Sequence, residues 1–503
     1  MELDRRIYSQ ARLTRDARFD GKFFIGVRSS RVYCRPICPA RTAKEENCTY
    51  FLTAAAAAEA GYRPCLRCRP ELSPGTPAWS GTSTTVSRAL RLISESALED
   101  GGVEALAERL GIGARHLRRL FLRHLGATPM SIAKTQRLHF AKKLIDETQL
   151  PFGEIALAAG FGSVRRFNSA FRTVYKRTPT EIRRLAHLRS TQPENEYCFR
   201  LRYRPPYHWE GLVAFLAPRA TPGVEVVQGG IYQRTIVLDG HAGTLAVSLS
   251  KTEPAVEVRI SFPESQLLFV IMERVRRMFD LTADPREIAT NLSKSSVLAE
   301  RVASMPGLRV PGCWDGFELA VRAILGQQVS VKGATTLAGR LAQKFGKPLL
   351  TGTTGLTHTS PTAESLAEAD VASIGLPEQR GETIRALARA VCAGHLAFGS
   401  GDVEDFKRQL KELPGIGEWT AQYIAMRAMG EPDAFPASDL GLLRVAGVSG
   451  PKELERMAEA WRPWRAYAAM YLWQATVKPS TTAVALPRID SEDSDAFRAE
   501  MAR

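Results

Sequence analysis

The sequence has few cysteines and no long apolar run, and both features exclude whole classes of protein. Eight cysteines in 503 residues are too few to hold a fold of this size together with disulfides. No segment approaches the roughly 18 consecutive apolar residues of a membrane-spanning helix. The first residues, Met1 to Arg6, lack the apolar core of a signal peptide. We therefore expect a cytoplasmic protein without a membrane partner.

Acidic residues are scarce in the first part of the chain. Residues 1–190 hold 33 Lys and Arg against 17 Asp and Glu, a net charge of +16, whereas residues 191–503 hold 35 against 36. A localised positive excess favours a polyanionic partner, DNA or RNA, with an anionic membrane surface as the alternative. The apolar content of 44% is ordinary for globular protein and excludes wholesale disorder.

Composition and periodicity divide the chain, which is too long for one compact core. A stretch rich in Pro, Gly, Ser and Thr predicts a linker, and the apolar residues after it recur every three or four positions, as in helices. Short β-branched runs at 230–238 and 245–249 predict strands, and a second helical pattern follows them. The predicted units are 1–72, a linker at 73–85, 86–190, 197–263, 264–478 and a disordered tail at 479–503.

Five of the eight cysteines lie close together in the first unit. Cys34 and Cys38, and then Cys65 and Cys68, form two tight pairs that can converge on one tetrahedral ion. Four thiolates suit Zn²⁺ better than the harder cations, and the spacing matches no common iron–sulfur pattern. We predict one Zn²⁺ with four Cys ligands and assign Cys48 to the core. The alternatives are four unrelated buried cysteines and a purely structural metal site.

The segments around these pairs resemble the zinc domain of the Ada family. The likeness is carried by residues 23–41, with Tyr-Cys-Arg-Pro at 33–36, and by residues 60–68, which end in Arg-Pro-Cys-Leu-Arg-Cys. The resemblance implies that Cys34 irreversibly takes a methyl group from a methylphosphotriester in DNA, and that Arg41 and Arg67 contact the DNA backbone. Methylation removes one negative charge from a site that faces phosphates, so repair can also strengthen DNA binding. Spacing alone does not distinguish Cys34 from its three neighbours.

Two helix-turn-helix patterns follow the linker. Residues 103–121 and 155–172 each combine an amphipathic helix, a glycine turn and a strongly basic second helix. The second copy and the Thr-Pro pairs after both copies resemble the AraC-type DNA-binding domain, with Lys176 where that family usually has glycine. Base edges and phosphates are both possible targets for the arginines, and phosphate is the commoner one. An ordinary helical bundle with solvated arginines is the alternative. The arginines predicted to contact DNA are Arg115, Arg118, Arg119, Arg165 and Arg166.

The last 300 residues are not basic, and their strongest signal is a hairpin. Leu-Pro-Gly-Ile-Gly at 413–417 opens a helix, where free backbone N–H groups can hold a phosphate. Asp439 follows at a loop-to-helix junction, and an aromatic-rich segment comes after it at 461–473. Together with residues 203–209 and 311–330, these elements resemble the AlkA-type 3-methyladenine DNA glycosylases of the helix-hairpin-helix superfamily.

The resemblance to the AlkA-type glycosylases implies a hydrolytic glycosylase with Asp439 as its catalytic carboxylate. Taken alone, Asp439 is better explained as a helix N-cap, which is the commoner role of an Asp before a helix; the hairpin and the aromatic residues together favour catalysis. No lysine lies between Trp419 and Tyr423, so we expect no lyase step through a Schiff base. The family has leucine at the wedge that fills the gap left by a flipped nucleotide, and this chain has Gln328 there. The implied DNA contacts are Gln328 at the wedge, Pro414, Gly415, Ile416 and Gly417 at the hairpin, and Trp419, Tyr423 and Trp473 in the base pocket.

The sequence thus predicts a multidomain DNA alkylation-response protein. Its expected fold is a small α+β zinc domain, an all-α double helix-turn-helix domain, an α+β subdomain and an all-α helix-hairpin-helix core. Its expected activities are methyl acceptance, methylation-controlled transcription activation and excision of bases such as 3-methyladenine. A Pro-Cys-His-Arg motif is absent, so O6-alkylguanine repair is not expected. Expected partners are double-stranded DNA, both alkylated and promoter DNA, with RNA polymerase as a further candidate. The alternative is a DNA-binding regulator whose zinc and glycosylase-like modules are non-catalytic.

Overall fold

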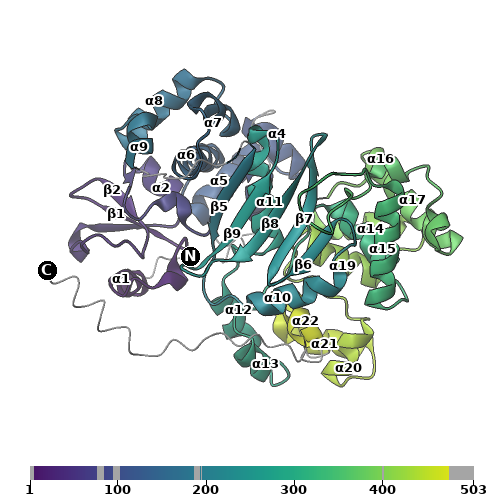
Figure 1. Cartoon of the computed structure of the whole chain (residues 1–503). Coiled ribbons are helices and arrows are strands. Elements are labelled where there is room, and N and C mark those ends of the chain that lie inside the picture. Colours follow the sequence, from purple (N-terminus) through teal and green to yellow (C-terminus); the bar gives the residue numbers. More distant parts are fainter. Residues whose placement is uncertain are drawn as a thin grey trace, which may run out of the picture.

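The computed structural model describes residues 5–75, 84–94, 102–185, 193, 195–398 and 402–474. Two separate β-sheets are surrounded by helices, and the chain runs from the smaller sheet to a large helical region (Figure 1). None of the described helices is long and apolar enough to cross a bilayer. The predicted disordered tail and most of the predicted linker lie outside the described residues.

The first unit is built on a four-stranded sheet in the order β3-β1-β2-β4. Strands β1, β2 and β3 pair antiparallel, whereas β4 runs parallel to β2. Thr53 caps α2 by accepting a hydrogen bond from the amide of Ala56, and the alanines of this helix pack on the sheet. The elements are α1 (Arg5–Leu13), β1 (Phe24–Val27), β2 (Val32–Cys34), β3 (Cys48–Phe51), α2 (Ala54–Glu59) and β4 (Arg63–Pro64).

Seven helices follow and form two similar halves joined by the 19-residue helix α6. Each half has a short helix, a turn at a left-handed glycine, and a longer basic helix; the glycines are Gly111 and Gly160. Phe121 and Phe167 of the basic helices are fully buried and anchor them. The helices are α3 (Thr84–Ser94), α4 (Gly102–Arg109), α5 (Ala114–Leu125), α6 (Pro129–Glu147), α7 (Phe152–Ala158), α8 (Val164–Tyr175) and α9 (Pro179–Leu185).

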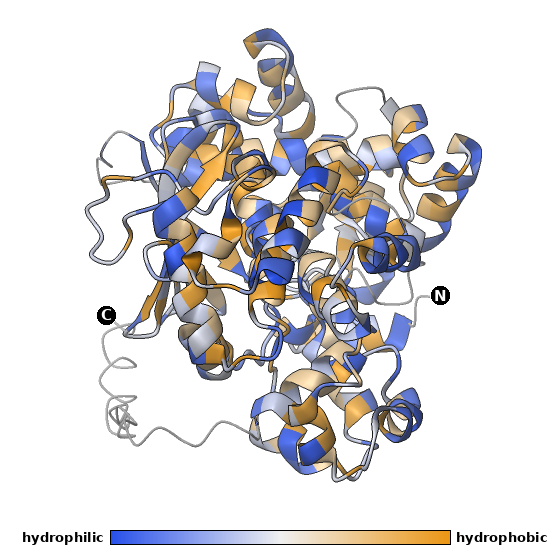
Figure 2. Cartoon of the chain, turned by 90° about the vertical axis from the view of Figure 1, so that its right-hand side faces the viewer, coloured by the Kyte–Doolittle hydropathy of each residue, from blue (hydrophilic) through white to orange (hydrophobic). Residues whose placement is uncertain are grey.

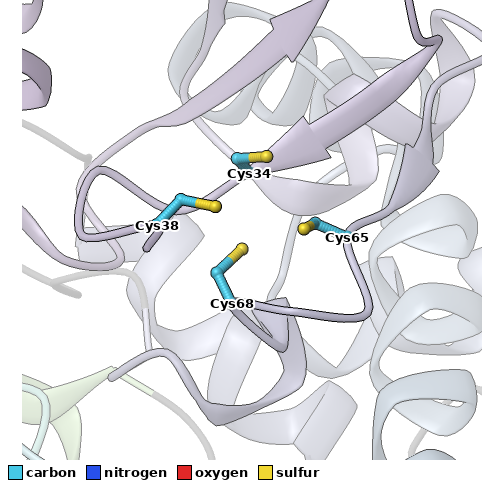
Figure 3. A group of neighbouring side chains, drawn as sticks. All are labelled: Cys34, Cys38, Cys65 and Cys68. Atoms are coloured by element: carbon cyan, nitrogen blue, oxygen red, sulfur yellow. The ribbon is translucent and has the colours of Figure 1, made fainter. Parts of the chain in front are cut away.

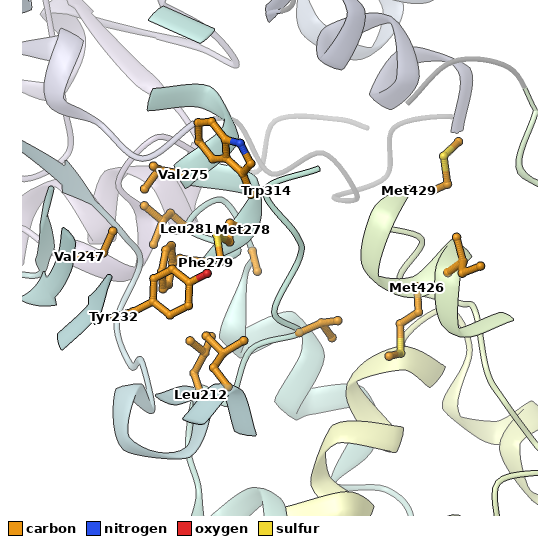
Figure 4. Packing of buried hydrophobic residues seen from close by; sticks show 14 of the residues in the cluster. Leu212, Tyr232, Val247, Val275, Met278, Phe279, Leu281, Trp314, Met426 and Met429 are labelled. Atoms are coloured by element: carbon orange, nitrogen blue, oxygen red, sulfur yellow. The ribbon is translucent and has the colours of Figure 1, made fainter. Parts of the chain in front are cut away.

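A five-stranded antiparallel sheet in the order β5-β9-β8-β7-β6 comes next. Side chains alternate along β5, so that one face of this strand is buried against α-helices. Tyr232 and Val247 of the sheet pack towards Leu212 and Phe279 (Figure 4). Both runs predicted as strands lie within β7 and β8. The elements are β5 (Glu196–Arg202), α10 (Trp209–Leu216), β6 (Glu225–Gln228), β7 (Ile231–Leu238), β8 (His241–Leu249) and β9 (Ala255–Ser261).

The last region is helical, as its periodicity predicts. Helices α14 and α22 are buried almost all round and form its centre. Apolar residues concentrate where the helices face one another, and polar residues lie on the outer turns (Figure 2). The helices are α11 (Leu268–Met278), α12 (Pro285–Leu292), α13 (Ala299–Ser304), α14 (Gly316–Leu325), α15 (Val331–Phe345), α16 (Ala363–Leu366), α17 (Glu378–Cys392), α18 (Val403–Glu412), α19 (Glu418–Ala428), α20 (Leu440–Ala446), α21 (Pro451–Ala458) and α22 (Arg465–Gln474).

The units share buried surface with one another. Phe140 of α6 packs on Phe269 of α11 with 4.9 Å between ring centroids. Lys143 of α6 donates to the carbonyl oxygen of Arg200 on β5 at 2.7 Å. Tyr33 of the first sheet hydrogen bonds to His139 of α6 at 2.9 Å. The predicted fold class is confirmed, and α6 is the element that contacts both sheets.

Candidate functional sites

A cluster of four cysteines lies at one edge of the smaller sheet. Strands β2 and β4 are parallel, with Tyr33 opposite Pro64, so the next residue of each strand, Cys34 or Cys65, leaves the sheet at the same edge. Cys38 and Cys68 lie on the loops that follow. All four sulfur atoms lie within 4.8 Å of one another and point to a common centre (Figure 3).

The chemistry of this cluster fits a tetrahedral metal ion. Zn–S bonds of about 2.3 Å place tetrahedral sulfurs about 3.8 Å apart, in keeping with the observed grouping. Four thiolates packed this closely repel one another unless a cation lies between them. The four cysteines therefore fit one Zn²⁺ with four Cys ligands. Cys48 is buried in the core outside the cluster, as expected.

The arginines around the cluster are of two kinds: one is buried and holds the cysteine loops in place, and two are exposed to solvent. Arg35 is 2% exposed and forms a buried ion pair with Asp20, and its amide donates to the sulfur of Cys68 at 3.4 Å. Arg35 therefore holds in place the loops that carry the cysteines, and it does not face solvent. Arg41 and Arg67, by contrast, are exposed on the loops that carry the cysteines.

The amide of Arg35 is a hydrogen-bond donor to the sulfur of Cys68. An N–H donor withdraws charge from a thiolate and makes it a weaker nucleophile. This bond makes Cys68 less suited to accept a methyl group, but it does not distinguish Cys34, the residue that the Ada resemblance selects, from Cys38 and Cys65.

The two basic helices present arginines to solvent over a buried aromatic face. Side chains of α5 and α8 that point inward are apolar, including Phe121 and Phe171, which are fully buried. Arg118 forms an exposed ion pair with Glu104 at 2.7 Å, and such a pair is weak enough to exchange for a phosphate. The five arginines predicted to contact DNA are all exposed: Arg115, Arg118, Arg119, Arg165 and Arg166.

Lys176 adopts the conformation of the glycine that it replaces. Its φ of 54° is left-handed, and Gly126 at the equivalent turn of the first half has a φ of 68°. We expect Lys176→Gly to raise the free energy of unfolding by about 0.5–1 kcal/mol, because relief of the left-handed strain outweighs the extra freedom of glycine in the unfolded chain. Urea denaturation followed by circular dichroism measures this change. Arg177→Gly, next to it at an ordinary φ, should lower stability; an increase there would contradict the explanation.

A cleft of about 880 Å³ lies between the larger sheet and the helical region, and Asp439 projects into it. The indole N–H of Trp419 donates to Asp439 Oδ2 at 3.0 Å, and that of Trp473 donates to Oδ1 at 3.1 Å. Oδ1 also accepts from the amide of Leu442 and thereby caps α20. Asp439 is therefore both a helix N-cap and the centre of an aromatic pocket, so the two interpretations of the sequence are compatible.

The predicted pocket aromatics are brought together around this carboxylate. Trp419 and Tyr423, one turn apart on α19, stack with 5.3 Å between ring centroids and 7° between planes. No base fits between rings this close, so a flipped base can only lie against an outer face of the pair. Trp473 stands at 64° to Tyr423 and packs beside Phe215, a pocket residue that the sequence did not indicate.

The hairpin uses its four residues in different ways. Gly415 has a φ of 83°, and a Cβ there would lie 2.3 Å from Thr383 Oγ1, so glycine is required. Ile416 is 5% exposed and its amide donates to Leu413, so this residue anchors the turn and its N–H is already used. Pro414, Gly415 and Gly417 are exposed at the start of α19, where a phosphate can approach.

Gln328 projects from the loop between α14 and α15 at the rim of the same cleft. It is exposed and left-handed, with a φ of 56°. Its neighbour Gln327 donates to Gly415 O at 2.9 Å and to Thr420 Oγ1 at 3.0 Å. Gln327 thereby ties the wedge loop to the hairpin, a role that the sequence analysis missed because no local pattern marks a contact 88 residues away.

Substitution at Gln328 tests the wedge. We expect Gln328→Ala to slow single-turnover base release about tenfold and Gln328→Leu to match or exceed the wild type, because an apolar side chain fills an unstacked base step better. Gln343→Ala, an exposed residue of α15, is the control and should change nothing. Equal rates for the alanine and wild-type proteins would remove Gln328 from the wedge.

The sequence matches four protein-family models in chain order. They are the metal binding domain of Ada at residues 8–71, a helix-turn-helix domain at 106–185, the AlkA N-terminal domain at 198–315, and the HhH-GPD superfamily base excision DNA repair protein at 321–466. A Mycobacterium tuberculosis protein named "Probable bifunctional transcriptional activator/DNA repair enzyme AlkA" is 42% identical over 474 residues, 93% of this chain and 95% of that protein. The chain belongs to this family of bifunctional transcriptional activator/DNA repair enzymes.

Two Escherichia coli proteins match complementary parts of this bifunctional architecture. DNA-3-methyladenine glycosylase 2 is 35% identical over 280 residues, 55% of this chain and 96% of the glycosylase. The bifunctional transcriptional activator/DNA repair enzyme Ada is 38% identical over 120 residues, 24% of this chain and 32% of that protein. The resemblances to Ada and to the AlkA-type glycosylases seen in the sequence are therefore confirmed.

Proposed function

We propose that this chain repairs alkylated DNA at two separate sites and activates transcription in response to the damage. One site, at Asp439, hydrolyses the N-glycosidic bond of alkylated bases such as 3-methyladenine. The other, at Cys34, accepts a methyl group from a DNA methylphosphotriester. The observation that carries the proposal is the fixed carboxylate of Asp439 among Trp419, Tyr423 and Trp473 in the cleft.

The glycosylase step needs little acid catalysis for a cationic base. When the bond between C1′ and the base nitrogen breaks, both electrons go to the base, which leaves neutral, and the sugar becomes an oxocarbenium-like cation. Asp439 accepts three hydrogen bonds, which fix the position of its carboxylate in the cleft. Its role is therefore to stabilise the cationic sugar, and water adds at C1′ and releases its proton to the solvent, which completes the hydrolysis.

The aromatic residues favour an electron-poor base. The outer face of the Trp419–Tyr423 pair and the ring of Trp473 supply stacking worth about 1–3 kcal/mol per base. The lesion must first leave the helix, which costs a few kcal/mol and less for damaged bases. Gln328 at the rim fills the resulting gap, and the amides of the exposed hairpin glycines hold the phosphate.

Methyl transfer at the cysteine cluster is irreversible. Bound Zn²⁺ keeps the coordinating sulfurs deprotonated at neutral pH. The sulfur of Cys34 attacks the methyl carbon; an S–C bond forms, the O–CH₃ bond breaks, and the phosphodiester oxygen leaves with the electron pair. Arg41 and Arg67 hold the flanking phosphates.

Methylation of Cys34 controls transcription through charge. The cluster loses one negative charge and repels DNA less, so Arg115, Arg118, Arg119, Arg165 and Arg166 hold promoter DNA more tightly. RNA polymerase is the partner that an activator of this kind recruits. The working units of this scheme are residues 1–72, 86–190, 197–263 and 264–478.

The test is release of free base from alkylated double-stranded DNA. The purified full-length chain should release 3-methyladenine catalytically. No release would favour the second candidate, a regulator whose glycosylase-like module is non-catalytic.

A further inference from the structure

Residues 65–75 carry two of the four cysteines and then contact both the DNA-binding helices and the glycosylase half; we call this segment the metal loop. Cys65 and Cys68 belong to the cluster that fits one Zn²⁺. Arg69 comes next and has a left-handed φ of 50°, a conformation that costs free energy in a residue with a side chain. The shape of the metal loop therefore depends on the contacts that hold it.

The first contact of the metal loop is with α6, the helix that joins the two helix-turn-helix halves. Lys142 of α6 donates to Glu71 at 3.2 Å, and Arg69 forms an ion pair with Asp146 of the same helix at 2.5 Å. The side chains of Glu71, Lys142 and Asp146 are 1%, 5% and 5% exposed. Burial raises the pKa of Glu71, but Lys142 and then Arg69 outweigh it and lower that pKa to about 2, so Glu71 stays charged.

The second contact is with the glycosylase half. Arg204 follows β5, is fully buried, and donates to Gly75 O at the end of the metal loop and to Thr282 O before α12. Lys22 of the first unit forms an ion pair with Asp284, whose side chain is 1% exposed. Asp284 also accepts from a backbone amide at 3.2 Å and thereby caps α12.

The metal loop holds Lys22 in place. Arg35 donates to Cys68 O at 3.0 Å and forms a buried ion pair with Asp20, two residues before Lys22. The residue between them is a glycine with no space for a side chain, since a Cβ there would lie 2.0 Å from a carbonyl oxygen of the metal loop. The position of Lys22 against α12 therefore follows the position of Cys68.

Both contacts bury charges that need their partners. A buried charge whose partner is removed is strongly destabilising, because its lost hydration is no longer compensated. Four thiolates at this spacing repel one another without a cation, so the metal loop can keep its place only when the cysteines bind a metal. A shift of the metal loop would take Glu71 away from Lys142 and Lys22 away from Asp284.

We propose that the metal loop, held in place by the Zn²⁺ that the cysteines bind, braces α6 and α12, so that loss of the metal loosens the DNA-binding and glycosylase halves although neither supplies a ligand. The cysteine cluster is then a joint between the units as well as a methyl acceptor, and metal loss reaches all of them at once. The inference rests on the four-cysteine site and on neither of the proposed repair activities.

The first test is hydrogen exchange of the full-length chain, measured by mass spectrometry with and without a zinc chelator under reducing conditions. Chelation should speed amide exchange at least about tenfold in α12 and in residues 140–147, the last turns of α6, because both lose buried partners. Helix α17 lies on the far side of the molecule from the smaller sheet and is the internal reference, whose exchange should stay unchanged (Figure 1).

The second test breaks the direct contact and keeps the metal. In Lys22→Met, α12 should exchange at least about tenfold faster than in the wild type with the metal bound, and chelation should add little to that increase. Native mass spectrometry should still find one zinc, and residues 140–147 should respond to chelation as in the wild type. Lys347→Met is the matched control, because this exposed lysine lies outside both contacts, and its exchange should equal that of the wild type.

Unchanged exchange in α12 and in residues 140–147 after chelation would overturn the proposal, since the metal would then serve the first unit alone. An equal increase in α17 would also overturn it, because the whole chain would loosen instead of the two braced helices. Wild-type exchange of α12 in Lys22→Met would contradict the route through the Lys22–Asp284 pair.

Discussion

Replacing Asp439 with asparagine should lower the single-turnover release of 3-methyladenine on the order of 10³-fold. The side chain keeps its size, and its oxygen can still cap α20 at the amide of Leu442. The negative charge beside C1′ is lost, and the new NH₂ group takes the place of Oδ2 and meets the indole N–H of Trp419, where two donors repel. Both effects raise the energy of the cationic sugar relative to the bound substrate.

Asp370→Asn is the matched control for this experiment. Asp370 also accepts from a backbone amide, that of Ser373, at the start of a helical turn outside the cleft. The Asp370→Asn variant also loses one carboxylate at a helix cap, and it should release base at the wild-type rate. Retention of full activity in Asp439→Asn would leave Asp439 as a helix cap alone.

Cys34→Ser should abolish methyl acceptance. Incubation of the wild type with methylphosphotriester DNA, followed by peptide mass spectrometry, should show one added methyl group, on Cys34. Serine cannot supply a thiolate, and the amide of Arg35 already weakens the sulfur of Cys68 as a nucleophile. Methyl found on Cys38, Cys65 or Cys68 of the wild type would contradict the assignment.

Two measurements separate this chemistry from a loss of fold. Cys48→Ser changes a buried cysteine of the same unit that lies outside the cluster, and it should keep methyl acceptance. Native mass spectrometry should find one zinc per wild-type chain. A second zinc, or none, would disagree with a four-cysteine site.

Local pattern was sufficient to predict some elements of this fold, such as β7, β8 and α5, but not how distant elements meet. The β-branched run of β7 and the apolar periodicity of α5 are local features of neighbouring residues. That β4 lies parallel to β2, and so sets Cys65 beside Cys34, depends on a pairing that no local pattern encodes. The sequence therefore indicated a metal site without showing how it is built.

Arg427 illustrates the same limit. It is buried on α19, which is a visible signal, but its guanidinium donates to the carbonyl oxygens of Pro311 and Gly312, 116 and 115 residues away in the chain. Ile416 shows the opposite case. Its place in the hairpin motif suggested a phosphate contact, whereas burial of its side chain and the bond from its amide to Leu413 make it an internal anchor.

Phe140 of α6 packs against Phe269 of α11 and joins the DNA-binding half of the chain to the glycosylase half. Each ring covers apolar surface of the other half, so neither half presents a finished exterior at this point. Because the two halves are also parts of one polypeptide, they are made in equal numbers and arrive together wherever the chain is carried. A single polypeptide fixes the ratio of the two halves at one to one, so their amounts need no separate regulation.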